Sequence, residues 1–302
     1  MGISEMHRET ATNPPASPSP AASFRSSSAA FPFRAVLSDV DGTLLDANRE
    51  VSGRTAAAIR ALDAAGVPFA LVTGRMPSGI EVIRRAFGIP MPAVCYSGAL
   101  VVDTENRPIA STTLSGDEAS FVMGLVADSF PQLATSYFAG LDWFVDDASH
   151  PAVQREISIV KARPERVDLA GVLSAGRLPN KLFFVCADDP SRSLDLVARI
   201  REGCPGLNII RSSDGVMVEV LPAGVDKASG TLSLLSALGV ERRDALFFGN
   251  DANDVPLLRA AGRGVAVGDA APCAQEAADD VAPASIDDGV ARYLEGLGLR
   301  GA

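Results

Sequence analysis

The chain contains few cysteines and no long apolar run. Its cysteines are widely separated and form no CxxC pair: Cys95, Cys186, Cys204 and Cys273. This pattern disfavours a zinc site and a disulfide framework, and it is typical of core thiols in a reducing compartment. No uninterrupted apolar stretch approaches the roughly 20 residues that a membrane-spanning helix needs. We therefore expect a cytoplasmic protein without a membrane partner.

Basic side chains are also in the minority. The 302 residues include 27 lysines and arginines against 37 aspartates and glutamates, which gives a net charge of −10. This balance disfavours a nucleic-acid partner, because clustered positive charge is what binds the phosphate backbone. A site for a small phosphorylated molecule would need local positive charge or a metal ion. The length is sufficient for two domains.

Residues 1–31 lack hydrophobic periodicity and are rich in alanine, serine and proline. They contain no apolar segment of the kind found in a signal peptide. Arg8 and Arg25 are too few for a transit peptide. We expect a disordered tail.

Two stretches, residues 32–97 and 222–302, alternate buried strands with amphipathic helices. Such alternation is typical of a doubly wound α/β fold, and we expect the two stretches to complete one Rossmann-like parallel sheet. Ser52 and Ser78 are placed to cap the first two helices, while Gly66 and Gly88 end them. The expected strands are Arg34–Ser38, Val67–Thr73, Ala93–Ser97, Ala245–Gly249 and Gly264–Gly268, and the expected helices are Thr55–Ala65, Ser78–Phe87, Ala228–Leu238, Val255–Ala261 and Gly289–Leu297.

Residues 98–221 differ in character, because short strands are separated by both helices and turns. We expect an α+β domain inserted into the α/β core, where it would act as a lid over the strand ends. A merely decorative insertion is the alternative. Trp143 and Lys181 would either line the pocket or belong to the core or surface of the inserted domain. Its expected strands are Val101–Asp103, Ala134–Phe138, Trp143–Val145, Lys181–Cys186, Asn208–Arg211 and Val216–Val220.

The segment from Arg34 to Leu45 is the most informative, because its apolar run ends in two carboxylates. Asp39 and Asp41 are two residues apart, so we expect them to project the same way, and Gly42 permits a sharp turn. Acids so close repel each other, and a bound cation would offset the repulsion. One carboxylate can then attack while the other exchanges protons with a leaving oxygen. An ordinary Asp-Gly turn is the alternative.

Three further segments place polar groups at strand ends or helix starts. Thr73 and Gly74 follow a strand and would offer a hydroxyl and backbone N–H groups to an anion. Lys227 precedes a helix, a position where most lysines are simply solvated. The segment Asn250–Asp254 offers the oxygen ligands that Mg²⁺ prefers, or it caps the helix that follows. Open parallel sheets bind ligands beyond the carboxyl ends of their strands, so we expect these groups to converge.

Together these segments resemble, in order and context, the four motifs of the haloacid dehalogenase superfamily of phosphohydrolases. The insertion between the Thr73 and Lys227 segments further resembles the Cof-type branch, whose members carry an α+β cap of the C2B type there. The resemblance covers residues 33–297. It is supported by Cys95-Tyr-Ser97-Gly98-Ala99, by Val218-Glu-Val-Leu-Pro-Ala-Gly-Val-Asp-Lys227 and by Asp288-Gly289-Val290-Ala291.

The resemblance implies a role for each motif. Asp39 would be the nucleophile that becomes an aspartyl phosphate, and Asp41 would be the general acid and base. Thr73, Gly74 and Lys227 would hold the phosphate. The implied Mg²⁺ ligands are Asp39, Asp41 through its backbone carbonyl, Asn250 and Asp254. Arg75, which adjoins Thr73, and Ser97, Asp251 and Asn253 are candidates to contact the substrate or to support the residues that do.

The metal-binding segment departs from the family pattern, which commonly reads Gly-Asp-x-x-Asn-Asp. Aligning its end with Asn253-Asp254 places Asn250 where the main metal-binding aspartate belongs. An amide oxygen can coordinate Mg²⁺, but the missing negative charge should weaken the affinity. Either Asn250 is the ligand or Asp251 replaces it, and we favour Asn250 with Asp254 in support.

The sequence thus predicts a Mg²⁺-dependent phosphatase of a small phosphorylated metabolite. A sugar phosphate or a nucleotide-like phosphate such as a flavin precursor is the expected substrate class. Two alternatives stay open: a mutase-like phosphotransferase, and a catalytically weakened binding protein that keeps the fold. The change at Asn250 is the best argument for the second. Neither the individual substrate nor the oligomeric state follows from the sequence.

Overall fold

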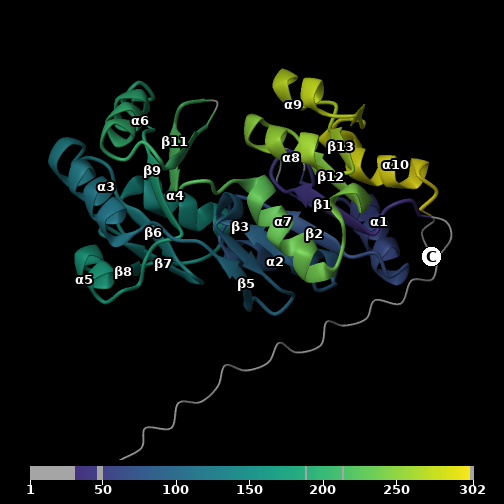
Figure 1. Cartoon of the computed structure of the whole chain (residues 1–302), viewed down its shortest axis with the longest axis horizontal. Coiled ribbons are helices and arrows are strands. Elements are labelled where there is room, and N and C mark those ends of the chain that lie inside the picture. Colours follow the sequence, from purple (N-terminus) through teal and green to yellow (C-terminus); the bar gives the residue numbers. More distant parts are fainter. Residues whose placement is uncertain (1–30, 46–49, 188, 213, 300–302) are drawn as a thin grey trace, which may run out of the picture.

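The computed structural model describes residues 31–45, 50–187, 189–212 and 214–299. The predicted N-terminal tail, apart from Phe31, lies outside these residues. Two sheets organise the described chain, one of eight strands and one of six (Figure 1). No helix among the described residues is both long enough and apolar enough to span a bilayer.

The larger sheet has the strand order β14-β13-β12-β1-β2-β3-β4-β5, and its first six strands are parallel. The stretches before and after the insertion therefore complete one sheet, which confirms the predicted α/β fold. Its strands are β1 (Ala35–Asp39), β2 (Phe69–Val72), β3 (Ala93–Cys95), β4 (Leu100–Val102), β5 (Pro108–Ser111), β12 (Ala245–Gly249), β13 (Arg263–Ala266) and β14 (Asp280–Val281).

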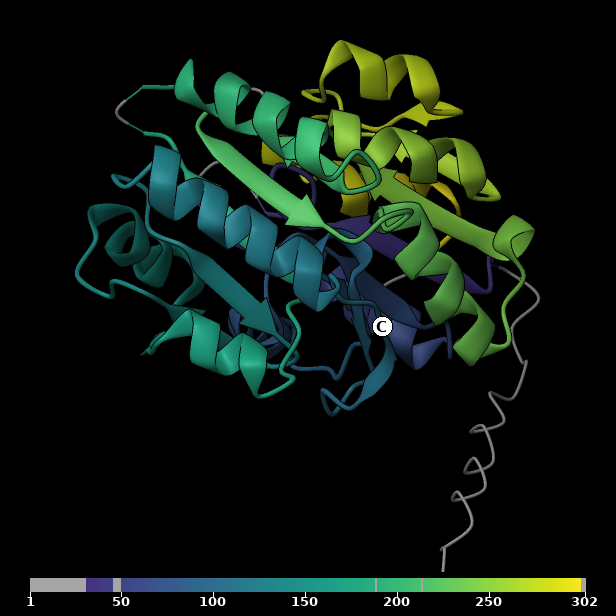
Figure 2. The same ribbon diagram turned by 60° about the vertical axis from the view of Figure 1, so that its left-hand side comes forward.

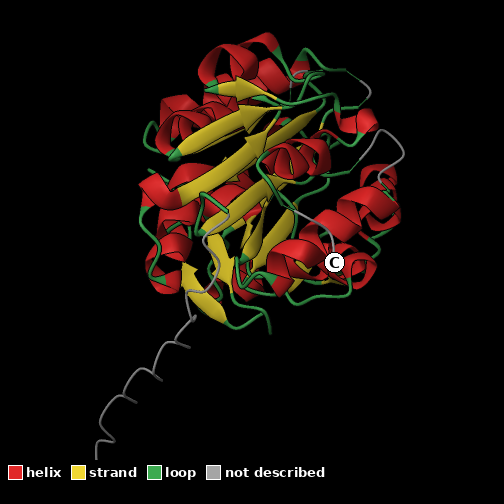
Figure 3. Cartoon of the chain, turned by 90° about the vertical axis from the view of Figure 1, so that its right-hand side faces the viewer, coloured by secondary structure: helices red, strands yellow, loops and turns green. Residues whose placement is uncertain are grey.

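Helices cover both faces of this sheet (Figure 3). Successive residues of a strand point to opposite faces, so Val36 packs in one hydrophobic cluster and Leu37 in another. The cluster around Val36 includes α1 (Gly53–Ala64), α2 (Pro77–Phe87) and α10 (Gly289–Gly296), and the cluster around Leu37 includes α7 (Lys227–Leu238), α8 (Val255–Ala260) and α9 (Pro272–Ala277).

The smaller sheet belongs to the inserted segment and has the order β10-β11-β9-β6-β7-β8 (Figure 2). One face packs against three helices of the same segment, and the other face, through Phe138 and Trp143, joins the cluster that contains Val36. The two sheets therefore share a continuous apolar contact. The elements are α3 (Gly116–Ser129), β6 (Ser136–Ala139), β7 (Asp142–Val145), α4 (Pro151–Val160), β8 (Glu165–Arg166), α5 (Leu169–Ser174), β9 (Lys181–Val185), α6 (Arg192–Gly203), β10 (Asn208–Arg211) and β11 (Met217–Leu221).

The insertion leaves the core sheet later than residue 98, where the sequence placed its start. Strands β4 and β5 pair antiparallel next to β3 and so extend the larger sheet to Ser111. The chain reverses direction through Tyr96, Ser97 and Gly98, which all have positive φ angles of 50°, 52° and 113°. The apolar run that contains Val101 indicates a strand, but periodicity alone cannot say which sheet receives it.

The predicted helix caps are confirmed at one serine and wrong at the other. The Ser52 hydroxyl accepts a hydrogen bond from the Thr55 N–H at 3.0 Å and caps α1. Helix α2 instead begins after Met76, and Ser78 makes no capping bond. Pro77 decides this start, because its fixed φ suits the first helical position and it has no N–H to satisfy. Gly88 ends α2 in the left-handed conformation, as expected.

The two serines give a matched test of capping. We expect Ser52→Ala to lower the free energy of unfolding by about 1 kcal/mol, because the Thr55 N–H loses its partner. Ser78→Ala should change it by less than about 0.5 kcal/mol, because Ser78 is exposed and caps nothing. Urea unfolding followed by circular dichroism measures both. Equal losses in the two variants would contradict the assigned start of α2.

Candidate active site

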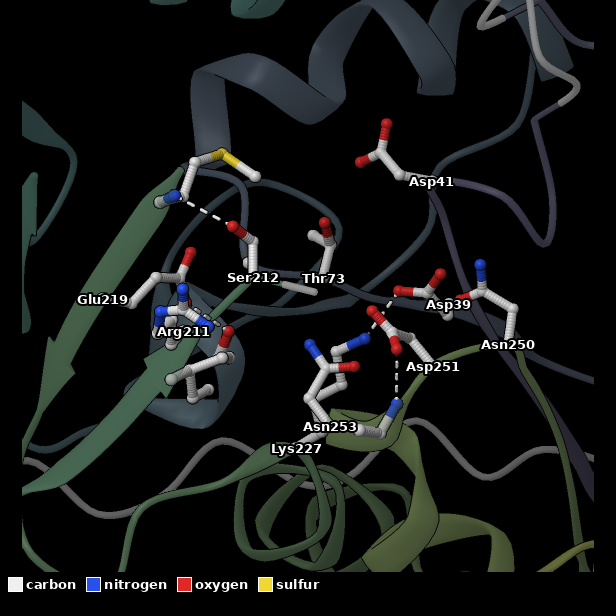
Figure 4. Close-up of a pocket in the computed structure, with 15 residues that line it drawn as sticks. Asp39, Asp41, Thr73, Arg211, Ser212, Glu219, Lys227, Asn250, Asp251 and Asn253 are labelled. Atoms are coloured by element: carbon white, nitrogen blue, oxygen red, sulfur yellow. Dashed lines mark hydrogen bonds and ion pairs between the residues drawn. The ribbon is translucent and has the colours of Figure 1, made fainter. Parts of the chain in front are cut away.

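Polar residues from four distant segments meet beyond the carboxyl ends of β12, β1 and β2, which are neighbours in the sheet. They surround a cavity of about 320 Å³ (Figure 4). The structure therefore brings the predicted motifs together at the expected edge. The lining residues from the core are Asp39, Asp41, Thr73, Gly74, Ser97, Lys227, Asn250, Asp251, Ala252 and Asn253.

The ammonium group of Lys227 lies at the centre of this arrangement. Its Nζ donates to Asp39 Oδ1 at 2.6 Å and to Asp254 Oδ1 at 2.7 Å. All three residues are buried, with 3%, 5% and 0% of their surface exposed, respectively. Lys227 is the first residue of α7, whose preceding residue Asp226 caps the helix. It is thus an internal ion-pair partner of the predicted nucleophile.

Burial and charge together shift the acidities of this cluster. Burial raises the pKa of Asp39 to about 7, although the Lys227 ammonium opposes the rise, and the Asp254 carboxylate adds to it. Burial alone would lower the pKa of Lys227, but the carboxylates of Asp254 and Asp39 raise it above its ordinary value. Two carboxylates share one ammonium, so the cluster has an excess of negative charge that a cation would offset.

Asp254 organises the site without lining the cavity. Its Oδ1 accepts from Lys227, and its Oδ2 accepts from the backbone N–H groups of Asn250 at 2.9 Å and of Asp251 at 3.2 Å. These bonds fix the loop after β12. Both oxygens already have partners, so the predicted coordination of a metal by Asp254 would require one of them to be shared. Its observed contacts give it a positioning role.

Contrary to the expectation from strand alternation, Asp41 and Asp39 do not project in the same direction. Its carboxylate points away from the centre of the cavity (Figure 4) and pairs with the Arg75 guanidinium, Nε to Oδ2 at 2.8 Å and Nη2 to Oδ1 at 2.5 Å. The reason is local, because β1 ends at Asp39 and Gly42 has a φ of 78°. Strand alternation no longer sets the direction there. Arg75 is therefore engaged by an acid of this chain, and it does not line the cavity.

The Thr73 loop is fixed by its backbone. The Thr73 N–H donates to the Val94 carbonyl at 2.8 Å, and Thr73 Oγ1 accepts from the Arg75 N–H at 3.1 Å. Gly74 follows at a point of close approach, where a Cβ would lie 3.0 Å from Glu219 Oε1 and 3.2 Å from Ser97 Oγ. A side chain here would disturb the wall of the cavity.

The oxygen donors near Asn250 fit a hard divalent cation. The Asn250 amide lies beside Asp39 (Figure 4), and Gly42 leaves room for it, since a Cβ there would be 2.4 Å from Asn250 Nδ2. The buried Asn253 Oδ1 has no hydrogen-bond partner. Within the described ranges no three carboxylate, imidazole or thiol groups gather as a metal site, so a cation here would need amide or backbone oxygens as well. Mg²⁺ accepts such mixed oxygen sets.

Sequence reasoning missed one wall of the cavity, which comes from the inserted segment. Met217 and Glu219 are two residues apart on β11 and share a face, whereas Val218 and Val220 point into the apolar cluster of the insertion. Period-two alternation at Met217–Val220 was the available signal. The residues of this wall are Ile210, Arg211, Ser212, Met217 and Glu219.

Comparison with known proteins identifies the family. Residues 36–294 match the haloacid dehalogenase-like hydrolases, so the chain belongs to that family. A Haemophilus influenzae protein is 29% identical over 263 residues, which cover 87% of this chain and 97% of that protein. The pyridoxal phosphate phosphatase of Escherichia coli is 26% identical, with 86% and 97% covered. A solved sugar phosphatase of the subclass IIB aligns with a TM-score of 0.75 at 19% identity, with 88% and 100% covered.

Removal of the central ammonium should destabilise the protein. In the metal-free protein we expect Lys227→Met to lower the free energy of unfolding by about 3 kcal/mol, because it leaves Asp39 and Asp254 buried without a counter-charge. Urea unfolding measures the loss. Lys161→Met is the control, since Lys161 is an exposed lysine at the end of α4. A loss in Lys227→Met no larger than in this control would contradict the arrangement.

Proposed function

We propose that the protein is a Mg²⁺-dependent phosphatase that hydrolyses a small phosphorylated metabolite through an aspartyl-phosphate intermediate. The main support for the proposal is the buried Asp39 carboxylate. Its Oδ1 accepts from Lys227 Nζ at 2.6 Å, in a cavity that Thr73 and Gly74 also line. This is a nucleophile beside a cation and a set of phosphate-binding groups. Membership of the hydrolase family supports the proposal.

In the first step, one oxygen of the Asp39 carboxylate attacks the phosphorus atom, and the bond from phosphorus to the leaving oxygen breaks. Lys227 binds Asp39 Oδ1, so Oδ2 is the oxygen free to attack. The Thr73 hydroxyl, the Gly74 backbone and the Lys227 ammonium stabilise the negative charge of the transferring group. Water then attacks the aspartyl phosphate, which releases orthophosphate and restores Asp39.

Asp41 transfers the protons in both steps. It gives a proton to the departing alkoxide and takes one from the attacking water. Arg75 holds both oxygens of Asp41 in the structure. Because a carboxyl that carries a proton cannot accept on both oxygens in this way, the pair with Arg75 has to open for the transfer.

The residues that would hold Mg²⁺ are Asp39, Asn250 and the backbone carbonyl of Asp41, with Asp251 as the alternative to Asn250. Bound there, the ion would supply positive charge to the phosphate oxygens and to the crowded carboxylates. Asp254 would keep the loop of Asn250 in place through its two backbone bonds.

A polar metabolite fits the remaining wall of the cavity. Arg211 and Ser212 offer hydrogen-bonding groups where a leaving group would lie, and Met217 adds an apolar surface. A sugar phosphate, or a nucleotide-like or cofactor-like phosphate, combines hydroxyl groups with an apolar face. The names of a pyridoxal phosphate phosphatase and a sugar phosphatase among the similar proteins favour the same classes.

Hydrolysis of p-nitrophenyl phosphate tests the mechanism. We expect Mg²⁺-dependent release of orthophosphate, and we expect Asp39→Asn to lower kcat by at least about 1,000-fold, because an amide cannot form the acyl phosphate. Glu241→Gln, an exposed residue outside the cavity, is the control. Activity that survives Asp39→Asn would sink the mechanism. Phosphorylated metabolites bound without turnover would favour the binding-protein alternative, and phosphoryl transfer to a sugar in place of water would favour the mutase-like one.

The assignment of the metal ligand has its own test. Asn250→Asp should lower the Mg²⁺ concentration for half-maximal activity by about tenfold, because an anionic oxygen replaces a neutral one. Asp251→Asn should leave that concentration unchanged if Asn250 is the ligand. Mg²⁺ titration of phosphatase activity measures both variants, and isothermal calorimetry measures Mg²⁺ affinity directly. The reverse order of effects would assign the ligand to Asp251.

A further inference from the structure

A second buried ammonium lies behind the phosphate-binding loop, and it comes from the inserted segment. Lys181, the first residue of β9, is 5% exposed. Its Nζ donates to the Gly74 carbonyl at 2.7 Å and to Glu219 Oε1 at 3.0 Å. Lys181 therefore connects β9 and β11 of the insertion with the loop that follows β2 of the core.

Aromatic rings complete the surroundings of this ammonium. Lys181 Nζ lies 5.0 Å from the ring centre of Phe138, 5.2 Å from that of Phe183 and 5.7 Å from that of Tyr96. Ring faces attract a cation and exclude water. Since a buried charge is strongly unfavourable without compensation, Glu219 is the anion that balances Lys181.

Glu219 links the hydrogen bonds of Lys181 to a residue in the wall of the cavity. Its Oε2 accepts from Ser97 Oγ at 2.8 Å, and the Ser97 N–H donates to the Thr73 carbonyl at 2.9 Å. Lys181 holds the next carbonyl, that of Gly74. Two successive carbonyls of the proposed phosphate-binding loop are therefore held by hydrogen bonds. The backbone N–H of Ser97 holds that of Thr73, and Lys181 holds that of Gly74.

We propose that Lys181 and Glu219 are positioning residues of the phosphatase, through which the inserted domain fixes the Thr73-Gly74 loop and keeps its charge compatible with a phosphate group. The inference rests on the proposed function. Glu219 lines the same cavity as Gly74, and a Cβ on Gly74 would lie 3.0 Å from Glu219 Oε1, so the charge of Glu219 lies close to the proposed phosphate-binding loop. The ion pair with Lys181 neutralises it there.

The charges predict an order among three variants. Lys181→Met leaves the Glu219 carboxylate uncompensated beside the phosphate site, and like charges repel. Glu219→Gln keeps the ammonium and removes that negative charge. The double variant Lys181→Met/Glu219→Gln removes both charges, so it lacks the repulsion but also lacks the bond to the Gly74 carbonyl. Phosphate affinity should therefore be highest in Glu219→Gln, lower in the double variant and lowest in Lys181→Met.

The experiment measures kcat and KM for p-nitrophenyl phosphate with Mg²⁺, together with the competitive inhibition constant of orthophosphate. We expect Lys181→Met to raise the KM and the inhibition constant by about 30-fold with a smaller change in kcat, because uniform binding of the phosphate is lost. In the double variant, the KM and the inhibition constant should be about tenfold lower than in Lys181→Met. Glu219→Gln should leave the inhibition constant equal to or below that of the unmodified chain.

A matched control uses the exposed ion pair of Arg177 and Asp142 in the inserted segment, neither of which lines the cavity. Arg177→Met and Arg177→Met/Asp142→Asn should leave both constants unchanged. A lower kcat with unchanged KM and unchanged inhibition constant in Lys181→Met would show a merely structural role and overturn the inference. A double variant no better than Lys181→Met would overturn it as well.

Three further outcomes also bear on the inference, and the last two separate it from the proposed function. If Lys181→Met does not fold, Glu219→Gln decides alone, because a raised orthophosphate inhibition constant in that variant contradicts charge compensation. An unmodified chain that binds orthophosphate without hydrolysing any phosphate ester would defeat the proposed function, yet the order of orthophosphate affinities, measured by calorimetry, would still support or overturn the inference. A chain that neither hydrolyses esters nor binds orthophosphate overturns both.

Discussion

The ion pairs of Lys227 with Asp39 and Asp254 are the interaction on which the active site depends. They join residues that are 188 and 27 positions apart in the chain. Asp39 is buried, and burial of a carboxylate is unfavourable without a cation nearby. The same ammonium binds Asp254, which in turn holds the backbone of Asn250 and Asp251. One side chain therefore fixes Asp39, the proposed nucleophile, and through Asp254 it fixes the loop that carries the proposed metal ligand Asn250.

The inserted domain contributes a second buried ion pair, next to the loop that carries Thr73 and Gly74. Lys181 is a buried ammonium that a carboxylate compensates, and its hydrogen bond to the Gly74 carbonyl reaches across from one sheet to the other. Two of the three lysines in a chain of net charge −10 are buried in this way. Local positive charge at the site thus coexists with a net negative charge on the chain as a whole. One apolar cluster contains residues of both sheets, so the insertion packs directly against the core that carries the site.

Asn250 is the departure from the common family pattern in the proposed metal-binding segment. The amide reduces the negative charge at a position where Asp39 already bears an unfavourable, buried charge. The cluster still has two carboxylates for one ammonium, so a divalent cation remains electrostatically favoured. In the proposed assignment, the amide of Asn250 would weaken metal binding without abolishing it.

The α/β core, the family and the identities of the motif residues could be predicted from the sequence alone, because hydrophobic periodicity and strand-end chemistry are local properties. How these residues pair became visible only in the folded chain. Asp41 turns to Arg75 because β1 ends at Asp39, and β4 joins the core sheet because Tyr96–Gly98 reverses the chain. The position of Lys181 behind Gly74 likewise depends on packing between two sheets. No local pattern encodes such contacts, since they arise from residues that are distant in sequence and become neighbours only when the chain folds.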